Sequence, residues 1–242
     1  MLACEAVGDG AHMREFWDAR ARENALYFVD STLDYRSPDT GRFWREGKEA
    51  LEGVLSLLQV TLRPTDHVVE IGCGVGRMTR ALAERVRRVT AIDVSPEMLA
   101  RARELNPGAE SVSWLQGDGV SLAGVPDSEA DACMSFVVFQ HIPQPAITLG
   151  YVREMGRILR PGAWAAFQVS NDPDLHRPSG ARRRVATLLG RSPRGRRDPA
   201  WLGSAIDLSE LSATAQEVGM TVERVHGEGT QFCLVLLQKR PT

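Results

Sequence analysis

Apolar and polar positions follow two periods along the chain, one typical of buried strands and the other of amphipathic helices. The run 68–71 is almost wholly apolar, as in a strand that is buried on both faces of a sheet. Residues 42–60 instead place Leu51, Leu55 and Leu58 on one face of a helix. Strands and helices alternate from there on, which predicts a mostly parallel sheet with helices on both faces.

The same pattern gives the bounds of the expected elements. Helices are expected over residues 13–35, 42–60, 77–86, 96–105, 146–159 and 207–218. Strands are expected over residues 68–71, 89–92, 112–115, 132–138, 163–169, 221–225 and 232–238. Only residues 226–231 separate the last two strands, and such a short link forces them to pair antiparallel.

Length and composition describe an ordinary globular chain. The 242 residues suffice for one sizeable α/β domain, and 43% of them are hydrophobic and 25% charged. A net charge of −2 argues against bulk attraction to nucleic acid. No apolar run approaches the roughly 18 residues that span a bilayer, and the first 13 residues lack the pattern of a secretion signal. We therefore expect a cytoplasmic protein that contacts no membrane.

The four cysteines are Cys4, Cys73, Cys133 and Cys233, and each stands alone in the sequence. No C-x-x-C pair indicates zinc binding or redox chemistry. We expect free thiols in a reducing cytosol, and we expect no metal site.

The strongest chemical signal is the segment 68–77, which reads Val-Val-Glu-Ile-Gly-Cys-Gly-Val-Gly-Arg. Three alternating glycines follow a buried strand and precede a helix, so a ligand can lie directly on the backbone. The dinucleotide fingerprint G-x-G-x-x-G does not fit, because Arg77 stands where a small residue is needed. The phosphate loop G-x-x-x-x-G-K-[ST] is also absent. An acid at Glu70 before three glycines predicts a different kind of nucleotide cradle.

Polar residues and glycines also follow the next three expected strands. Asp93 ends the second strand, Asp118 follows the third, and residues 136–143 follow the fourth. Ligands of such sheets bind beyond the carboxyl ends of the strands, so we expect these residues to meet. A carboxylate at position 93 can accept hydrogen bonds from both hydroxyls of a ribose, each worth about 1.5–3 kcal/mol.

Across residues 68–238 these features resemble the class I, Rossmann-like family of S-adenosylmethionine-dependent methyltransferases. The segment 70–76 is similar to the first motif of that family, and residues 93–99 are similar to its D-x-S-x-x-M-L pattern. Residues 159–163 resemble the family's L-[KR]-P-G-G turn, with Ala163 as a departure. The resemblance implies S-adenosylmethionine as cofactor and a three-layer α/β/α sandwich, whose seven-stranded, mostly parallel sheet ends in an antiparallel strand.

The resemblance also implies roles for individual residues. In the family, the first motif holds the methionine part of the cofactor, the acid matching Asp93 binds the ribose, and the residues matching Met98 and Asp118 meet the adenine. The implied cofactor-binding set is Glu70, Gly72, Cys73, Gly74, Gly76, Asp93, Val94, Met98, Gly117, Asp118, Gly119 and Phe136. Structural roles stay open: Glu70 or Asp93 as helix caps, Asp118 in an Asx turn, and Met98 as core.

His141 is the candidate catalytic base, because it follows the fourth expected strand, next to the place where the methyl group is expected. An imidazole with an ordinary pKa near 6.5 can take a proton from a hydroxyl at neutral pH. A substrate contact and a purely structural role remain open for the same residue. Gln140, Tyr27 and Trp44 are further candidates for binding the acceptor substrate.

Two regions are expected around this core. Residues 1–60 are expected to form a helical cap or lid, and residues 61–242 the methyltransferase domain, with an insertion at about 171–206. Residues 176–199 within it hold eight arginines and one acid, Asp198. This stretch is either a solvated loop or a rim that attracts an anionic substrate, a carrier or nucleic acid.

We expect methyl transfer to an oxygen or nitrogen of a small molecule or a natural-product intermediate. A homodimer is one possible assembly of the chain. Methylation of a peptide or protein is one alternative, and a non-catalytic cofactor-binding partner subunit is another. Methylation of nucleic-acid bases is disfavoured, because no D-P-P-Y or N-P-P-Y run follows the fourth expected strand.

Overall fold

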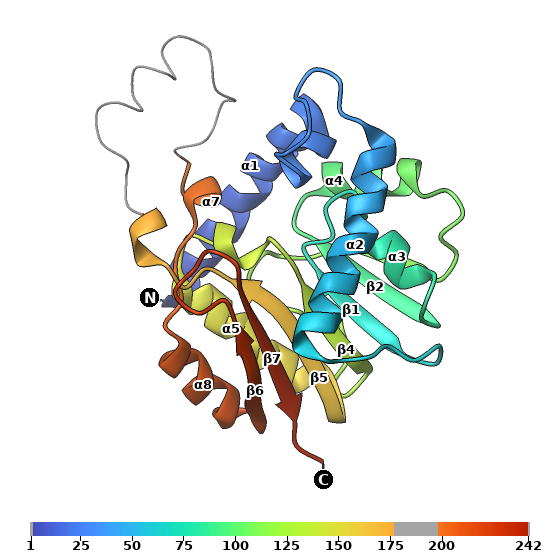
Figure 1. Cartoon of the computed structure of the whole chain (residues 1–242). Coiled ribbons are helices and arrows are strands. Elements are labelled where there is room, and N and C mark those ends of the chain that lie inside the picture. Colours follow the sequence, from blue (N-terminus) through green and yellow to red (C-terminus); the bar gives the residue numbers. More distant parts are fainter. Residues whose placement is uncertain (1, 177–197, 242) are drawn as a thin grey trace.

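The computed structural model describes residues 2–176 and 198–241, with side chains from residue 9 onward within these ranges. Its centre is a seven-stranded sheet in the order β3-β2-β1-β4-β5-β7-β6 (Figure 1). The strands are β1 (His67–Ile71), β2 (Arg88–Asp93), β3 (Val112–Gln116), β4 (Ala130–Ser135), β5 (Leu159–Val169), β6 (Met220–His226) and β7 (Cys233–Lys239). Strands β1 to β5 pair in parallel, and β7 pairs antiparallel with β5 and β6. The predicted sheet is confirmed.

Helices cover both faces of this sheet, which confirms the predicted three-layer sandwich. The helical elements are α1 (Leu2–Val29), α2 (Thr40–Leu58), α3 (Thr79–Ala83), α4 (Pro96–Leu105), η1 (Phe139–His141), α5 (Pro145–Ile158), η2 (Pro173–His176), α7 (Pro199–Leu202) and α8 (Leu208–Glu217). Helices α2 and α3 lie in front of the sheet in Figure 1, whereas α5 and α8 lie behind it. Helix α1 passes over the carboxyl ends of the strands and approaches α7 there.

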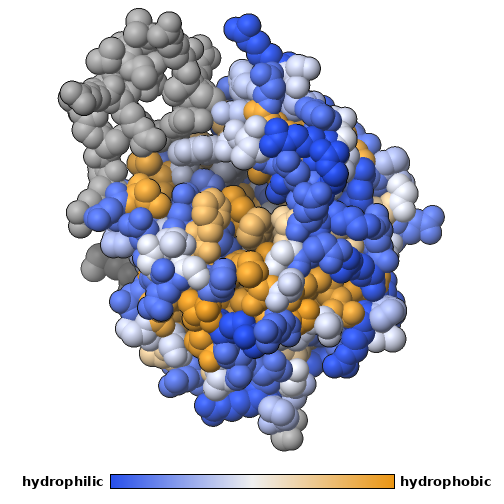
Figure 2. All heavy atoms as spheres, in the orientation of Figure 1, coloured by the Kyte–Doolittle hydropathy of each residue, from blue (hydrophilic) through white to orange (hydrophobic). Residues whose placement is uncertain are grey.

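Alternate residues of the central strands belong to two separate hydrophobic cores. In β7, Val235 and Leu237 pack into the core under α5 and α8, and Leu234 and Leu236 pack into the core under α2 and α3. All five residues of β1 are buried. This burial on both faces is the reason why the strand sequences read as continuous apolar runs. Figure 2 shows the front face, where hydrophobic residues gather over the middle of the molecule and hydrophilic residues surround them.

Several predicted bounds are wrong. The chain leaves the strand after Ser135 and not after residue 138, because Val137 takes the left-handed conformation with φ 59°. The helix predicted over 77–86 is shortened to α3, since residues 74–78 form a turn around the glycines. The helix predicted over 13–35 ends at Val29 and contains a non-helical residue, Asn24.

The division at residue 60 stays a prediction. Helix α2 packs its apolar face onto the sheet, whereas α1 covers the carboxyl ends of the strands. All eight arginines predicted as a loop or rim lie within 177–197, outside the described residues. Among the described cysteines, Cys73, Cys133 and Cys233 are buried and free. No helix in residues 2–176 or 198–241 is long and apolar enough to cross a bilayer.

Candidate cofactor and acceptor site

The turn between β1 and α3 leaves no room for a side chain at its glycine positions. Gly72 and Gly74 have φ of 72° and 54°, a region that residues with a Cβ rarely adopt. A Cβ on Gly72 would stand 2.3 Å from Cγ2 of Val138, and one on Gly74 would stand 2.8 Å from Cγ2 of Val29. Gly72 and Gly74 also line a cavity above the turn, whereas Gly76 does not. A Cβ on Gly76 would instead meet Trp114 at 2.8 Å, so this third glycine serves internal packing.

Asp93, at the end of β2, fixes the turn from the neighbouring strand. Its Oδ2 accepts a hydrogen bond from the backbone N–H of Gly74 at 2.8 Å, and its Oδ1 accepts one from the N–H of Ser95 at 2.9 Å. Burial raises the pKa of Asp93 to about 6, although these hydrogen bonds oppose the shift. A carboxylate has about four acceptor positions, so Asp93 can still accept hydrogen bonds from a ligand.

Glu70, the predicted acid before the glycines, is buried beside the turn. The hydroxyl of Thr79, the first residue of α3, donates a hydrogen bond of 2.5 Å to its Oε2. Burial raises the pKa of Glu70 to about 7, and the nearby charge of Asp93 adds to the shift. Glu70 thus holds the start of α3 and also lines the cavity.

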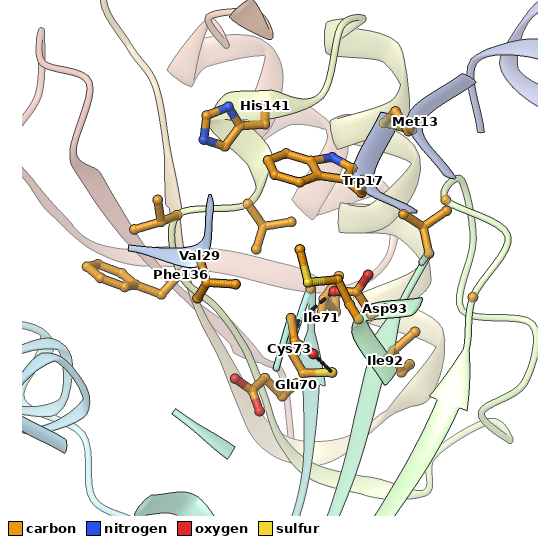
Figure 3. Close-up of a pocket in the computed structure, with 18 of the residues that line it drawn as sticks. Met13, Trp17, Val29, Glu70, Ile71, Cys73, Ile92, Asp93, Phe136 and His141 are labelled. Carbon is orange, nitrogen blue, oxygen red and sulfur yellow. Dashed lines mark hydrogen bonds between the residues drawn. The ribbon is translucent and has the colours of Figure 1, made fainter. Parts of the chain in front are cut away.

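A cavity that opens to solvent lies above the turn. It brings most of the predicted site residues together. The predicted residues in its lining are Glu70, Gly72, Cys73, Gly74, Asp93, Val94, Met98, Gly117, Gly119, Phe136 and His141. Figure 3 shows Glu70, Cys73 and Asp93 at one end, which we call the glycine end. Met13, Trp17 and His141 lie at the other end.

This other end, which we call the aromatic end, is formed by Met13, Trp17, Phe28 and His141. The first three side chains come from α1 and were not predicted as site residues. Met13 and Trp17 are one helical turn apart, so they share a face of α1 that points to the sheet ends. That spacing was the available signal, but a sequence alone does not say which cavity such a face covers.

The other predicted site residues lie outside the lining. Asp118 accepts hydrogen bonds at Oδ1 from the N–H groups of Val120 and Ser121, and at Oδ2 from the Ser121 hydroxyl, which closes an Asx-type turn. Tyr27 packs edge-on against Phe28, at 5.3 Å between ring centroids. Gly76, Gln140 and Trp44 also lie outside the lining.

A chain of hydrogen bonds fixes the tautomer of His141. The N–H of Val137 donates to Oε1 of Gln168 at 2.9 Å, and this turns Nε2 of Gln168 toward Oε1 of Gln140, at 3.0 Å. Nε2 of Gln140 then donates to Nε2 of His141 at 3.1 Å. At the far end, Nδ1 of His141 donates to the carbonyl oxygen of Trp201 at 2.8 Å. Because a backbone donor starts the chain and a backbone acceptor ends it, the proton of His141 lies on Nδ1 and Nε2 is the acceptor.

His141 is uncharged in this environment. Burial lowers its pKa to about 4, and the nearby His176 adds to the shift. Its ring packs against Trp17 at 5.5 Å and against Trp201 at 5.2 Å between centroids. The side chain can therefore accept a hydrogen bond at neutral pH, but it brings no positive charge to the aromatic end.

Among the described residues that line the cavity, Arg77 is the one lysine or arginine, and it already has an acid partner. Its Nη2 lies 2.8 Å from Oδ2 of Asp30, and both side chains are largely buried. Its guanidinium also lies over the ring of Phe43, 5.7 Å from the centroid. Within the described parts of the chain, no three His, Cys, Asp or Glu side chains form a group that could hold a metal ion.

Comparison with known proteins agrees with this geometry. A family model described as a methyltransferase domain matches residues 69–167. A ubiquinone biosynthesis O-methyltransferase of Nitrosospira multiformis is 31% identical over 164 residues, which are 66% of this chain and 64% of that protein. The chain belongs to the class I S-adenosylmethionine-dependent methyltransferases. S-adenosylmethionine is the cofactor that members of this family use.

Other members of the family resemble the chain over different lengths. A trans-aconitate 2-methyltransferase of Azoarcus sp. is 37% identical over 120 residues, which are 49% of this chain and 44% of that protein. The chain thus spans less than two thirds of the length of these curated relatives. The structure of Haemonchus contortus phosphoethanolamine N-methyltransferase 1, in complex with phosphoethanolamine and S-adenosylhomocysteine, has a TM-score of 0.69 at 15% identity, and the match covers 98% of this chain and 50% of that one.

The glycine end fits the cofactor of this methyltransferase family. Gly72 and Gly74 line the cavity and carry no side chain, so a ligand can lie against their backbone. Asp93 keeps acceptor positions free beside the turn, as binding of a ribose requires. Val94 and Met98 add apolar surface on the same side of the cavity, where an adenine ring can pack.

Proposed function

We propose that this chain transfers a methyl group from S-adenosylmethionine to a hydroxyl oxygen of a small molecule. The observation that carries the proposal is that one cavity joins a cofactor cradle to a neutral histidine whose acceptor nitrogen is defined. The O-methyltransferase named among the relatives supports oxygen as the acceptor atom. When bound, S-adenosylmethionine supplies an electrophilic methyl group on a positively charged sulfur.

The residues of the glycine end bind and orient the cofactor in this proposal. Asp93 accepts hydrogen bonds from the ribose hydroxyls, and the open backbone at Gly72 and Gly74 lies against the methionine part. Val94 and Met98 pack against the adenine. The apolar walls exclude water, so the acceptor oxygen competes with no solvent nucleophile.

His141 accepts the proton of the acceptor hydroxyl. An imidazole with a pKa of about 4 is a weak base toward a free hydroxyl. The hydroxyl proton becomes strongly acidic as the oxygen–carbon bond forms, and even a weak base then takes it. His141 therefore holds the hydroxyl before transfer and receives its proton late in the step.

Methylation of a peptide or protein stays a prediction, and so does a role as a non-catalytic partner subunit. An acidic peptide could be held by the arginines of residues 177–197, which lie outside the described residues. A non-catalytic subunit would need the glycine end but not a fixed tautomer at His141.

A transfer assay tests the proposal. The chain is incubated with S-adenosylmethionine labelled in its methyl group and with a panel of hydroxylated small molecules, and labelled products are separated by chromatography. We expect label on a small molecule, and a loss of that label in His141→Ala. Label found only on added peptides or proteins, or a failure of S-adenosylmethionine to bind, contradicts the proposal.

A further inference from the structure

We propose that the acceptor is a neutral hydroxyl compound with a flat apolar ring, such as a phenol, and not a carboxylate. The inference rests on the proposed function and adds the chemical class of the acceptor to it. It matters because the relatives include both an O-methyltransferase of ubiquinone biosynthesis and a trans-aconitate 2-methyltransferase. The aromatic end discriminates between these classes by shape and by charge.

Aromatic rings surround the aromatic end on several sides. Trp17 and His141 meet at 5.5 Å between centroids, with an angle of 73° between their planes. Trp201 packs behind both, at 6.2 Å from Trp17 and 5.2 Å from His141. Phe28 meets Trp201 edge-on at 6.0 Å. Such offset and perpendicular arrangements leave ring faces and edges for another planar ring to pack against.

These walls are held in place from two directions. Helix α7, which carries Trp201, is tied to α1 by the contact of 2.8 Å between Asp198 and His12. The hydroxyl of Ser204 donates to the carbonyl oxygen of Ile142 at 2.8 Å, which ties the chain after α7 to the residue after η1. The aromatic end is thus a preformed slot, and a rigid flat ring loses little freedom on entering it.

The charges at the cavity oppose an anionic acceptor. Glu70 and Asp93 are the acids of the lining, and the cation Arg77 is paired with Asp30. Arg20 lies outside the lining, with its guanidinium over the rings of Phe16 and Phe28, and it forms an ion pair with Glu23. His141 donates its Nδ1 proton to a backbone carbonyl, and its Nε2 accepts from the amide of Gln140, so it has no N–H to offer an anion. Among the described lining residues, a buried carboxylate would find one cation, Arg77, whose charge is already balanced by Asp30, which is unfavourable.

A neutral hydroxyl fits the same groups. Nε2 of His141 now accepts a hydrogen bond from the amide of Gln140, and an incoming hydroxyl donates to the same nitrogen in its place. In the transfer, the hydroxyl oxygen forms a bond to the methyl carbon while the carbon–sulfur bond breaks and its electron pair stays on sulfur. The hydroxyl proton moves to Nε2 of His141 and then to solvent. The products are a methyl ether and the neutral thioether S-adenosylhomocysteine.

Ligand binding to the chain saturated with S-adenosylhomocysteine tests the inference. The neutral probes are catechol and 4-methoxyphenol, and the anionic probes are benzoate and trans-aconitate; affinities are measured by ligand-observed NMR. We expect the neutral probes to bind at least about ten-fold more tightly, because an unpaired buried charge costs more than 1.4 kcal/mol. We expect Trp17→Ala to weaken the neutral probes by about ten-fold, and Phe232→Ala, at an exposed aromatic residue, to leave them unchanged.

The outcomes separate the two proposals. The inference is overturned if the anionic probes bind as tightly as the neutral ones. It is also overturned if the neutral probes fail to bind, or if Trp17→Ala leaves their affinity unchanged. In each of these cases, binding of S-adenosylhomocysteine leaves the proposed function standing. Failure of S-adenosylhomocysteine itself to bind removes the proposed function, and the inference with it.

Discussion

The glycine end and the aromatic end of the cavity are built in different ways. The glycine end comes from one stretch of chain, in which the turn after β1 is tied to Asp93, 19 residues after Gly74. The side chains of the aromatic end come from α1 and η1, and α7 packs Trp201 behind them, so that Trp17 meets Trp201 across most of the chain length. Local backbone geometry defines the first end, and tertiary packing of side chains defines the second.

This difference explains what a sequence alone can predict. Glycines with positive φ and an acid at the end of the next strand form a sequence motif with a fixed spacing. Gly72, Gly74 and Asp93 could therefore be predicted to share a site, and the structure has them in the lining of the cavity. Trp17 and Trp201 leave no such signature, because aromatic residues also pack helices that lie far from any site. Variants that separate local geometry from packing test this comparison.

The largest effect is expected for Gly72→Ala. The new Cβ would stand 2.3 Å from Val138, and the residue would keep a φ of 72°. We expect S-adenosylmethionine affinity to fall by about 100-fold, near 3 kcal/mol, measured by calorimetry. Gly162→Ala is the matched control, because Gly162 has φ 78° and open space around it. Equal losses in the two variants would mean that strain of the backbone, and not the cradle, controls binding.

His141→Ala tests the aromatic end. We expect turnover to fall by about 100-fold, as is typical for the loss of a general base, while S-adenosylmethionine affinity changes less than about two-fold. His226→Ala, at an exposed position of β6, serves as the control for loss of an imidazole. Turnover is measured as formation of S-adenosylhomocysteine with the acceptor found in the transfer assay. A drop in cofactor affinity as large as the drop in turnover would contradict this role, because it would indicate that His141 binds the cofactor and not the acceptor.

Asp93→Asn and Asp118→Asn separate two acids that the family resemblance assigned to the cofactor. We expect Asp93→Asn to weaken S-adenosylmethionine binding by about ten-fold, since it removes charge-assisted hydrogen bonds. We expect Asp118→Asn to change the affinity less than about three-fold, because Asp118 lies outside the lining and binds its own turn. Equal losses in calorimetry would restore the predicted contact of Asp118 with the adenine.

The pH dependence of cofactor binding sharpens the role of Asp93. Its pKa is raised to about 6, so its carboxylate is charged above that pH and protonated below it. Wild-type affinity for S-adenosylmethionine is expected to fall as the pH falls through about 6, and Asp93→Asn is expected to lose most of this dependence. A wild-type affinity that stays constant from pH 8 to pH 5 would contradict the role of a charged acceptor.

The smallest effect is expected for Glu70→Gln, measured as a change in thermal stability without cofactor. The pKa of Glu70 is raised to about 7 in the folded chain, so its charged form destabilises the fold above that pH. Glutamine removes this charge, and we expect a gain on the order of 1 kcal/mol at pH 8. The gain should shrink as the pH falls from 7 to 4.5 and disappear below 4.5, where Glu70 is protonated in both the folded and the unfolded state. A gain that is constant with pH would show that burial of the charge is not the cause.

The sequence predicted the sheet and its helices because apolar periodicity follows directly from burial on two faces. Predictions failed where local chemistry or packing overrides the pattern. The strand predicted through residue 138 ends at Ser135, because Val137 takes a left-handed conformation, in which its N–H donates to the side chain of Gln168 on β5. Tyr27 was predicted to bind the acceptor substrate. It packs against Phe28 instead, and Phe28 lines the cavity.

The structure of the chain with S-adenosylhomocysteine bound tests the central claim most directly. We predict that the ribose hydroxyls lie within hydrogen-bonding distance of the Asp93 carboxylate. We also predict that the homocysteine part lies on the open backbone of Gly72 and Gly74, with its sulfur toward His141. A ligand bound elsewhere, or bound at the turn with its sulfur away from the aromatic end, would contradict the account.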